Sequence, residues 1–232
     1  MFLLITRNVS ESVEKKLRSL LAMKVDAYIV SDEEPLIESK RIIHYPDSFM
    51  QEIGWTHHMS QAKNRITAWD KATYHAYKTG AKHVWICEDD VFWNKSSVLK
   101  QILHHESNVD LIAYPLAQSY QSAPEWYHWE KVQMITLNKK HWIATYNQLC
   151  RVSHRLLSRM AELAEKRHRL YFHEGMFGTL CKMNGYGIEY YNTLPGIYFL
   201  VRWNHPFTQE QIDELIHSHK HVLLHPVKMD LV

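Results

Sequence analysis

The sequence predicts an α/β fold in which a mostly parallel central sheet is flanked by helices. Short apolar runs of the buried-strand type alternate with longer segments whose apolar residues recur at helical spacing. The chain has 232 residues, of which 46% are hydrophobic, so it is long enough to bury a sizeable core. It shows no internal repeat, low-complexity linker or break in composition, and we expect a single domain over 1–232.

The alternation is clearest in the first half of the chain. Apolar runs predict strands over 2–6, 26–30, 41–44 and 83–87. Helical periodicity predicts helices over 10–23 and 60–78, with Ser10 as the N-cap of the first and Gly80 in the C′ position of the second. This alternation favours a parallel sheet, and such sheets carry their ligand-binding groups at the carboxyl ends of the strands.

The second half of the chain is less regular. It contains predicted strands over 110–115 and 132–138, an aromatic loop over 120–129, and predicted helices over 153–166, 173–184 and 208–218. The segment 150–157 is interpreted as the start of a structural helix. We therefore expect two unequal lobes within one domain, with the smaller lobe in the second half.

Charge and cysteine content argue against several classes of protein. The formal net charge is +2, and the basic residues are scattered rather than clustered, so no nucleic-acid partner is expected. The cysteines Cys87, Cys150 and Cys181 form no CxxC pair and are odd in number, which favours reduced thiols. No window reaches the roughly 20 apolar residues of a membrane span, and the N-terminal apolar run is too short for a signal peptide.

Three consecutive carboxylates, Glu88, Asp89 and Asp90, directly follow the strand predicted over 83–87. Alternation along a strand places Glu88 and Asp90 on one face and Asp89 on the other. A hard divalent cation such as Mn²⁺ or Mg²⁺ binds carboxylate oxygens and keeps positions for substrate phosphates. Such an ion also neutralises a diphosphate leaving group. A solvated acidic turn is the alternative interpretation of the triplet.

The acidic stretch resembles the DxD-type motif of GT-A glycosyltransferases, in a Glu-Asp-Asp variant, and small viral and bacterial members are the most similar. The resemblance implies a Rossmann-like domain with a nucleotide-sugar-binding half over about 1–92 and an acceptor-binding half over about 93–232. It implies that Asp90 ligates the metal, that Glu88 contacts the ribose or the metal, and that Asp89 belongs to the nucleotide-sugar site. The leading glutamate departs from the usual aspartate and leaves the nature of its contact open.

Further residues match positions that the resemblance assigns to the donor side. His225 is implied as a second metal ligand and Lys228 as a contact of the diphosphate, because they follow the acidic triplet in the family's order and spacing. The other implied nucleotide-sugar contacts are Thr6, Arg7, Asp32, Lys63, Arg65 and Asp70. Each has an ordinary alternative: a turn aspartate, a solvated helix face, or one of the 17 histidines on the surface or in the core.

The acceptor side is implied by two other segments. Glu174 lies where inverting GT-A enzymes place a general base, and its aromatic neighbours favour a raised pKa through partial desolvation. The alternative is an acidic residue that simply stabilises a helix N-terminus. The aromatic residues of the loop are expected to form an acceptor platform or, equally, to pack the lobe. These residues are Tyr120, Trp126, Tyr127 and Trp129.

Together the matches imply a metal-dependent glycosyltransferase. The donor would be a nucleoside diphosphate sugar, with a UDP-sugar favoured, and the acceptor a hydroxyl of an oligosaccharide or glycoconjugate. Mn²⁺ or Mg²⁺ would be the cofactor. Golgi members of the family carry a membrane anchor, a stem and usually disulfides. A cytoplasmic enzyme of bacterial or viral origin, in the host cytoplasm if viral, is therefore expected.

Two other hypotheses stand beside this one. A metal-dependent nucleotidyltransferase or phosphoesterase also uses carboxylates at strand ends. The turn after the first predicted strand lacks the glycine of a nucleotidyltransferase phosphate loop, however, and a two-metal phosphoesterase needs more than one dense cluster of ligands. A non-catalytic carbohydrate-binding relative of the fold is the third hypothesis.

Overall fold

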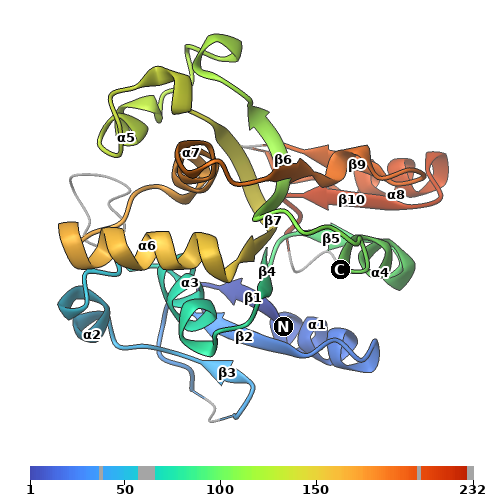
Figure 1. Ribbon diagram of the computed structural model, residues 1–232. Helices are drawn as coiled ribbons and strands as arrows, with labels where there is room; N and C mark the ends of the chain where they lie inside the picture. The colour runs from blue at the N-terminus through green and yellow to red at the C-terminus, as the bar shows by residue number, and fades with distance from the viewer. Residues whose placement is uncertain (37–38, 57–65, 203–204, 229–232) are drawn as a thin grey trace.

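The computed structural model describes residues 1–36, 39–56, 66–202 and 205–228. Its strands form a mixed seven-stranded sheet in the order β3-β2-β1-β4-β7-β6-β8 and a three-stranded sheet in the order β5-β10-β9 (Figure 1). The strands are β1 (Phe2–Thr6), β2 (Ala27–Ser31), β3 (Ile42–Ile43), β4 (His83–Glu88), β5 (Phe92–Trp93), β6 (Leu111–Ala117), β7 (Ala144–Ser153), β8 (Ile188–Tyr190), β9 (Tyr198–Val201) and β10 (Val222–His225).

The first half of the chain builds the parallel part of the large sheet. Strands β3, β2, β1 and β4 are neighbours and run parallel, as the alternation predicts. The central strand β1 is buried on both faces, since Leu3 and Ile5 enter one apolar core while Phe2 and Leu4 enter the other. Beyond β4 the sheet becomes mixed, because β7 is antiparallel to both β4 and β6. The parallel strands therefore bring their carboxyl ends to one edge.

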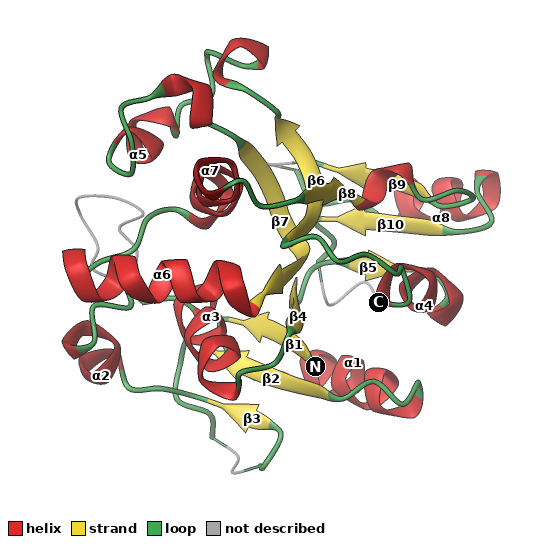
Figure 2. Ribbon diagram, viewed as in Figure 1, coloured by secondary structure: helices red, strands yellow, loops and turns green. Residues whose placement is uncertain are grey.

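Helices cover both faces of the large sheet (Figure 2). One apolar core contains residues of α3, α6 and α7, and the other contains residues of α1 and α4. The helices are α1 (Glu11–Ala22), α2 (Asp47–Glu52), α3 (Ala68–Thr79), α4 (Ser96–Leu103), α5 (Trp129–Gln133), α6 (His154–Arg167), α7 (His173–Asn184) and α8 (Gln209–Ser218), with 3₁₀ turns η1 (Tyr120–Ser122), η2 (Lys139–His141) and η3 (Tyr191–Thr193).

Local hydrogen bonds fix where the helices begin. Ser10 caps α1 by accepting the Val13 N–H, as predicted. Helix α3 begins at Ala68 rather than at position 60, because Thr67 and Asp70 form a capping box there. Positions 60–65 lie outside the described residues. Gly80 ends α3 with a φ of +67°, the left-handed conformation that its predicted C′ position requires.

One expectation for the second half is wrong. The range 132–138 is not a strand: Val132 belongs to α5 and lies one helical turn from Trp129, so both side chains enter the same small core. The segment 150–157 does contain the start of a helix, since α6 begins at His154, but its first residues end strand β7, which was not predicted. The buried side chains of β7 include polar ones, and this mixture removes the apolar pattern of a strand.

Two simpler features agree with the sequence. Cys87, Cys150 and Cys181 are all buried and free, as expected for reduced thiols. Among the described residues, no helix has the length and apolar character needed to cross a bilayer.

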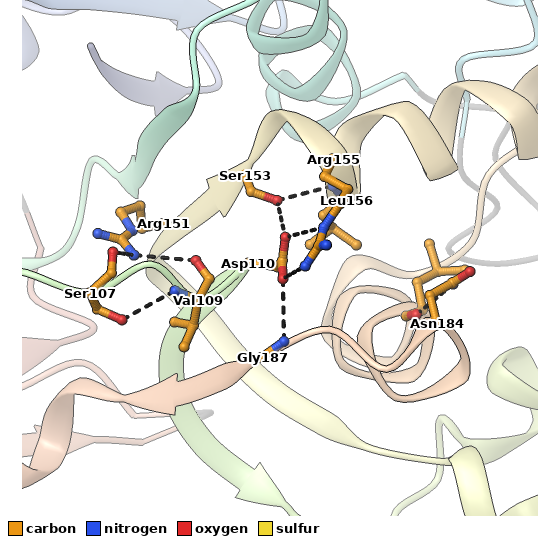
Figure 3. A network of polar contacts seen from close by, with 10 residues as sticks. Ser107, Val109, Asp110, Arg151, Ser153, Arg155, Leu156, Asn184 and Gly187 are labelled. Atoms are coloured by element: carbon orange, nitrogen blue, oxygen red, sulfur yellow. Dashed lines mark hydrogen bonds and ion pairs between the residues drawn. The ribbon is translucent and has the colours of Figure 1, made fainter.

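Asp110 joins three segments at the start of β6 (Figure 3). Its carboxylate accepts hydrogen bonds from Ser153 Oγ at 2.7 Å, from Arg155 Nε and Nη2 at 3.0 and 2.5 Å, and from the Gly187 N–H at 3.2 Å. Burial opposes its charged form, but the hydrogen bonds from Arg155 and Ser153 outweigh burial and lower the pKa of Asp110 below its usual range. The network ties the end of β7 and the start of α6 to the loop before β8.

Asp110→Asn is expected to destabilise the protein by about 1–3 kcal/mol, the cost of leaving buried hydrogen-bonding groups poorly paired. Because its folded pKa is lowered, the carboxylate contributes stability above the unfolded pKa of about 3.9, and this contribution is lost as the pH falls through the folded value. Urea unfolding from pH 7 to pH 3 measures the difference. Asp26→Asn removes a carboxylate whose side chain is 57% exposed, and it serves as the control. Equal losses in both variants would contradict the prediction.

Candidate metal and nucleotide site

The acidic triplet lies where the two sheets meet. Strand β4 ends at Glu88, and the turn that follows brings Glu88 and Asp90 to His225, the last residue of β10. His225 Nε2 lies 3.2 Å from Glu88 Oε2 and 3.2 Å from Asp90 Oδ1. One ligating atom from each of these three residues lies within 4.8 Å of the other two. The structure therefore groups the two residues predicted as metal ligands with Glu88.

This donor set fits a divalent cation. Two carboxylates and one imidazole are ligands that Mn²⁺ accepts, with positions left for phosphate oxygens. Asp90 Oδ1 is shielded from solvent, and His225 Nε2 at 3.2 Å is the polar atom that faces it. Burial disfavours the charged imidazole of His225, but the carboxylates of Asp90 and Glu88 outweigh burial and raise its pKa to about 9. The space between the three side chains thus strongly favours a positive charge.

Trp69 on α3 holds the first carboxylate in place. Its indole Nε1 donates a hydrogen bond to Glu88 Oε1 at 2.8 Å. The same ring stacks on His173 at the start of α7, with centroids 4.1 Å apart and planes at 15°. Trp69 was not among the residues predicted for the site. The sequence feature that could have indicated it is an indole N–H in a buried helix, because a buried indole N–H needs an acceptor nearby.

A pocket of about 200 Å³ opens beside the acidic turn, at the carboxyl ends of β1, β2 and β4. Asp90 and Trp69 line it, so the pocket and the candidate metal ligands share one wall. Five of the residues predicted to bind the nucleotide sugar also line it: Thr6, Arg7, Asp32, Glu88 and Asp89.

Several of these lining residues also have structural partners. Asp89 accepts a hydrogen bond from Thr6 Oγ1 and so points away from His225, as alternation along the strand predicts. Burial raises the pKa of Asp89. The Asp32 carboxylate accepts the N–H of Ala68 at the start of α3. Arg7 pairs with Glu33 at 2.9 Å. The turn aspartate considered as an alternative for Asp32 therefore has a definite task as a helix cap.

Two other predicted donor-side residues, Asp70 and Lys228, do not line the pocket. Asp70 is 2% exposed and its carboxylate belongs to the capping box of α3, which the spacing of Thr67 and Asp70 already indicates. Lys228 is exposed and follows β10 closely. Lys63 and Arg65 lie outside the described residues.

Glu174 is buried in the first turn of α7. Its side chain is almost fully enclosed, with 2% exposure of the residue. Gln148 Nε2 donates to its Oε1 at 3.3 Å, whereas its Oε2 has no hydrogen-bond partner among the described residues. Burial raises the pKa of Glu174 well above its usual range, the charge of Glu88 raises it further, and His225 lowers it. The carboxyl is therefore electrostatically coupled to the candidate metal ligands, and the predicted rise in pKa is confirmed.

Most of the aromatic loop packs the small lobe. Trp129 is 5% exposed, stacks on Trp142 with centroids 5.6 Å apart, and donates from Nε1 to the Ala123 carbonyl at 2.7 Å. The contacts of Trp129 are therefore those of the alternative interpretation, in which the aromatic residues pack the lobe. Tyr120 lies edge-on to both of these indoles.

Two other aromatic residues of the loop lie toward α7. Trp126 packs edge-on against Trp129, with centroids 4.7 Å apart, and borders Gly175 next to Glu174. Tyr127 is the exposed one of the four predicted platform residues, at 60%. Partial burial raises the pKa of its hydroxyl, and the charge of Glu174 raises it further. Of the four, Tyr127 alone offers an exposed ring.

Comparison with known proteins gives structural similarity only. No protein-family model matches the sequence, and no curated protein matches it. A galactosyltransferase, LgtC, in complex with donor and acceptor sugar analogs is similar over 86% of this chain and 76% of its own, with 12% identity and a TM-score of 0.47. Mouse xyloside xylosyltransferase 1 is similar over 97% and 96%, with 9% identity and a TM-score of 0.42.

A third similar structure is a glycosyltransferase involved in the glycosylation of the major capsid of PBCV-1. It is similar over 99% of this chain and 94% of its own, with 9% identity and a TM-score of 0.42. All three proteins are glycosyltransferases. Identities and TM-scores this low transfer neither an activity nor the role of any residue to this chain.

Proposed function

We propose that this protein transfers a sugar from a nucleoside diphosphate sugar to an acceptor hydroxyl, with a divalent cation at Asp90, His225 and Glu88. The observation that carries the proposal is the cluster of these three side chains beside a pocket at the carboxyl ends of parallel strands. Ligands of open α/β sheets bind outside these strand ends. Glu174, a buried carboxyl coupled to the same cluster, supplies the second requirement of the chemistry.

The donor side has a separate task for each group of residues. Asp90 and His225 would hold the ion, and Glu88 would contact the ion or the ribose. When bound, the ion would neutralise the charge that builds up on the departing diphosphate. Lys228, exposed just after β10, adds a positive charge for the same diphosphate. The pocket lined by Thr6, Arg7, Asp32 and Asp89 would take the nucleoside.

The acceptor side carries out the proton transfer. In the inverting reaction that we propose, the acceptor oxygen forms a bond to the anomeric carbon, and the bond from that carbon to the β-phosphate oxygen breaks. The bonding electrons leave with the diphosphate, and Glu174 takes the acceptor proton. A carboxylate with a raised pKa is a stronger base than an ordinary one, which favours this role. The exposed ring of Tyr127 would cover an apolar face of the acceptor sugar.

The finer assignments rest on the sequence resemblance. We propose Mn²⁺ or Mg²⁺ as the ion, a UDP-sugar as the donor, and an oligosaccharide or glycoconjugate as the acceptor. The buried free cysteines support a reducing compartment such as the cytoplasm.

Thermal unfolding with a panel of nucleotide sugars tests the proposal. We expect a UDP-sugar with Mn²⁺ to raise the midpoint, since a ligand at 100 times its Kd stabilises by about 2.7 kcal/mol. Asp90→Ala should lose this effect, and the exposed control Asp213→Ala on α8 should keep it. No shift with UDP-, GDP-, CMP- or dTDP-sugars would contradict the proposal. A shift without sugar release to any acceptor would instead support a non-catalytic binding protein.

A further inference from the structure

The backbone of the acidic turn is held by donors from two distant segments. Lys16 on α1 donates from Nζ to the carbonyl of Asp89 at 2.8 Å and to that of Val91 at 2.5 Å. The carbonyl between them, that of Asp90, accepts the N–H of Val227 at 2.8 Å. Three successive carbonyls of the turn are therefore all occupied, two of them by one ammonium group.

Lys16 acts on the backbone of the turn rather than on its carboxylates. Within the described part of the chain, no ion pair joins Lys16 to a carboxylate oxygen, although Asp89 and Asp90 stand beside it. Its Nζ lies over the ring of Trp93, 4.5 Å from the ring centroid. Burial lowers the pKa of Lys16, and the charges of the acidic turn act in the opposite direction. Partial burial of an ammonium group costs free energy, and its two hydrogen bonds to the turn offset that cost.

The turn also borders open space on the side of α1. A pocket of about 190 Å³ lies there, lined by Lys15, Lys16, Trp93, Val227 and Asp90 itself, among others. Asp90 thus borders a cavity on each side. Trp69 and Thr6 hold the side chains of Glu88 and Asp89, whereas Lys16 and Val227 hold the backbone carbonyls of the turn. Since Val227 follows His225 closely, the same bonds set the position of Asp90 relative to His225.

We propose that Lys16 is a positioning residue for the divalent-cation site, in that it locks the acidic turn so that Asp90 and His225 meet at coordinating distance. This inference rests on the proposed metal-dependent function. The competing interpretation is that Lys16 only balances the charge of the triplet. The two interpretations predict opposite changes in cation affinity when the Lys16 ammonium is removed. Removing a nearby positive charge alone would tighten cation binding, whereas losing the lock would weaken it.

Binding of Mn²⁺ to the full-length protein, measured by electron paramagnetic resonance of the free ion without nucleotide, tests the inference. Lys16→Met keeps the stem and removes the ammonium, and it should weaken Mn²⁺ binding by about 10–100-fold, the usual effect of losing a group that orients a ligand. The matched control is Lys15→Met, which removes the same charge from an exposed neighbour in the same pocket. It should leave the affinity unchanged or slightly tighter. Lys16→Arg, which keeps a charged donor, should recover most of the affinity.

The outcomes separate this inference from the proposed function. If Lys16→Met binds Mn²⁺ as tightly as the wild type, or more tightly, Lys16 is not a positioning residue, while the proposed metal site is unaffected. Wild-type protein that binds no Mn²⁺ overturns both. Should Lys16→Met fail to fold, as far-UV circular dichroism would show, the neutral variant Lys16→Gln takes its place. Mn²⁺ binding in that variant as tight as in the wild type, or tighter, overturns the lock.

Discussion

Asp90→Asn is expected to lower kcat/KM for sugar transfer by about 10³-fold, equivalent to about 4 kcal/mol of transition-state stabilisation. The amide has the size of the carboxylate, and the hydrogen bond from the Val227 N–H to the Asp90 carbonyl is kept, so the turn should keep its shape. What is lost is the negative oxygen that, with His225 and Glu88, would hold the proposed cation, whose charge would stabilise the departing diphosphate. Product formation from a UDP-sugar at saturating Mn²⁺ measures the effect.

Two controls separate this effect from general damage. Asp213→Asn changes an exposed aspartate of α8 and should behave as the wild type. A chelator added to the wild type should reproduce the loss seen in Asp90→Asn. If Asp90→Asn keeps full activity in the presence of the chelator, then transfer needs no cation at this site.

Glu174→Gln is expected to reduce kcat by about 10²–10⁴-fold, the usual contribution of a general base. The side chain keeps its volume, and its Oε1 can still accept the hydrogen bond from Gln148, so the fold of α7 and the KM for the donor should change little. Because burial raises the pKa of Glu174, the wild-type rate should fall on acidification at a higher pH than an ordinary glutamate, with its pKa of about 4.3, would cause. Steady-state rates across pH at saturating acceptor measure both effects.

A control variant and one contrary result test the role of Glu174. Glu165→Gln alters an exposed carboxyl of α6 and should leave the rate and its pH profile unchanged. A Glu174→Gln variant that transfers sugar at the wild-type rate, while Asp90→Asn does not, would exclude an inverting mechanism with this base. A retaining reaction would then be the better description of the same site.

The parallel half of the fold was predictable because its strands are apolar throughout. Strand β1 puts all five of its residues into the core, and an apolar run of that length has few other uses. Strand β7 is just as central but holds Asn147 and Arg151. Asn147 donates to the His173 carbonyl and Arg151 to that of Ser107, so both are paired by distant segments. No local pattern contains that information.

The candidate site was likewise predictable only in part. Strand-end position and residue type indicated that the acidic triplet needs a compensating charge, whereas the choice of His225 as the partner of Asp90 came from the resemblance. Trp69 and Lys16 act through contacts made only in three dimensions, across α3 and α1. The sequence left the packing of Trp129 open because its burial depends on Trp142, which the chain reaches only after the rest of α5 and the turn η2.

The joint between the two sheets has a consequence for the order in which the protein becomes active. Glu88 and Asp90 leave the ribosome early, but His225 and Val227, which complete the proposed cation site, belong to the last strand described and the turn after it. A nascent chain can build its parallel sheet without being able to hold the ion. If the proposed function holds, half-made molecules would not consume the activated sugar, and catalytic competence would begin only when the late strand β10 has joined the rest.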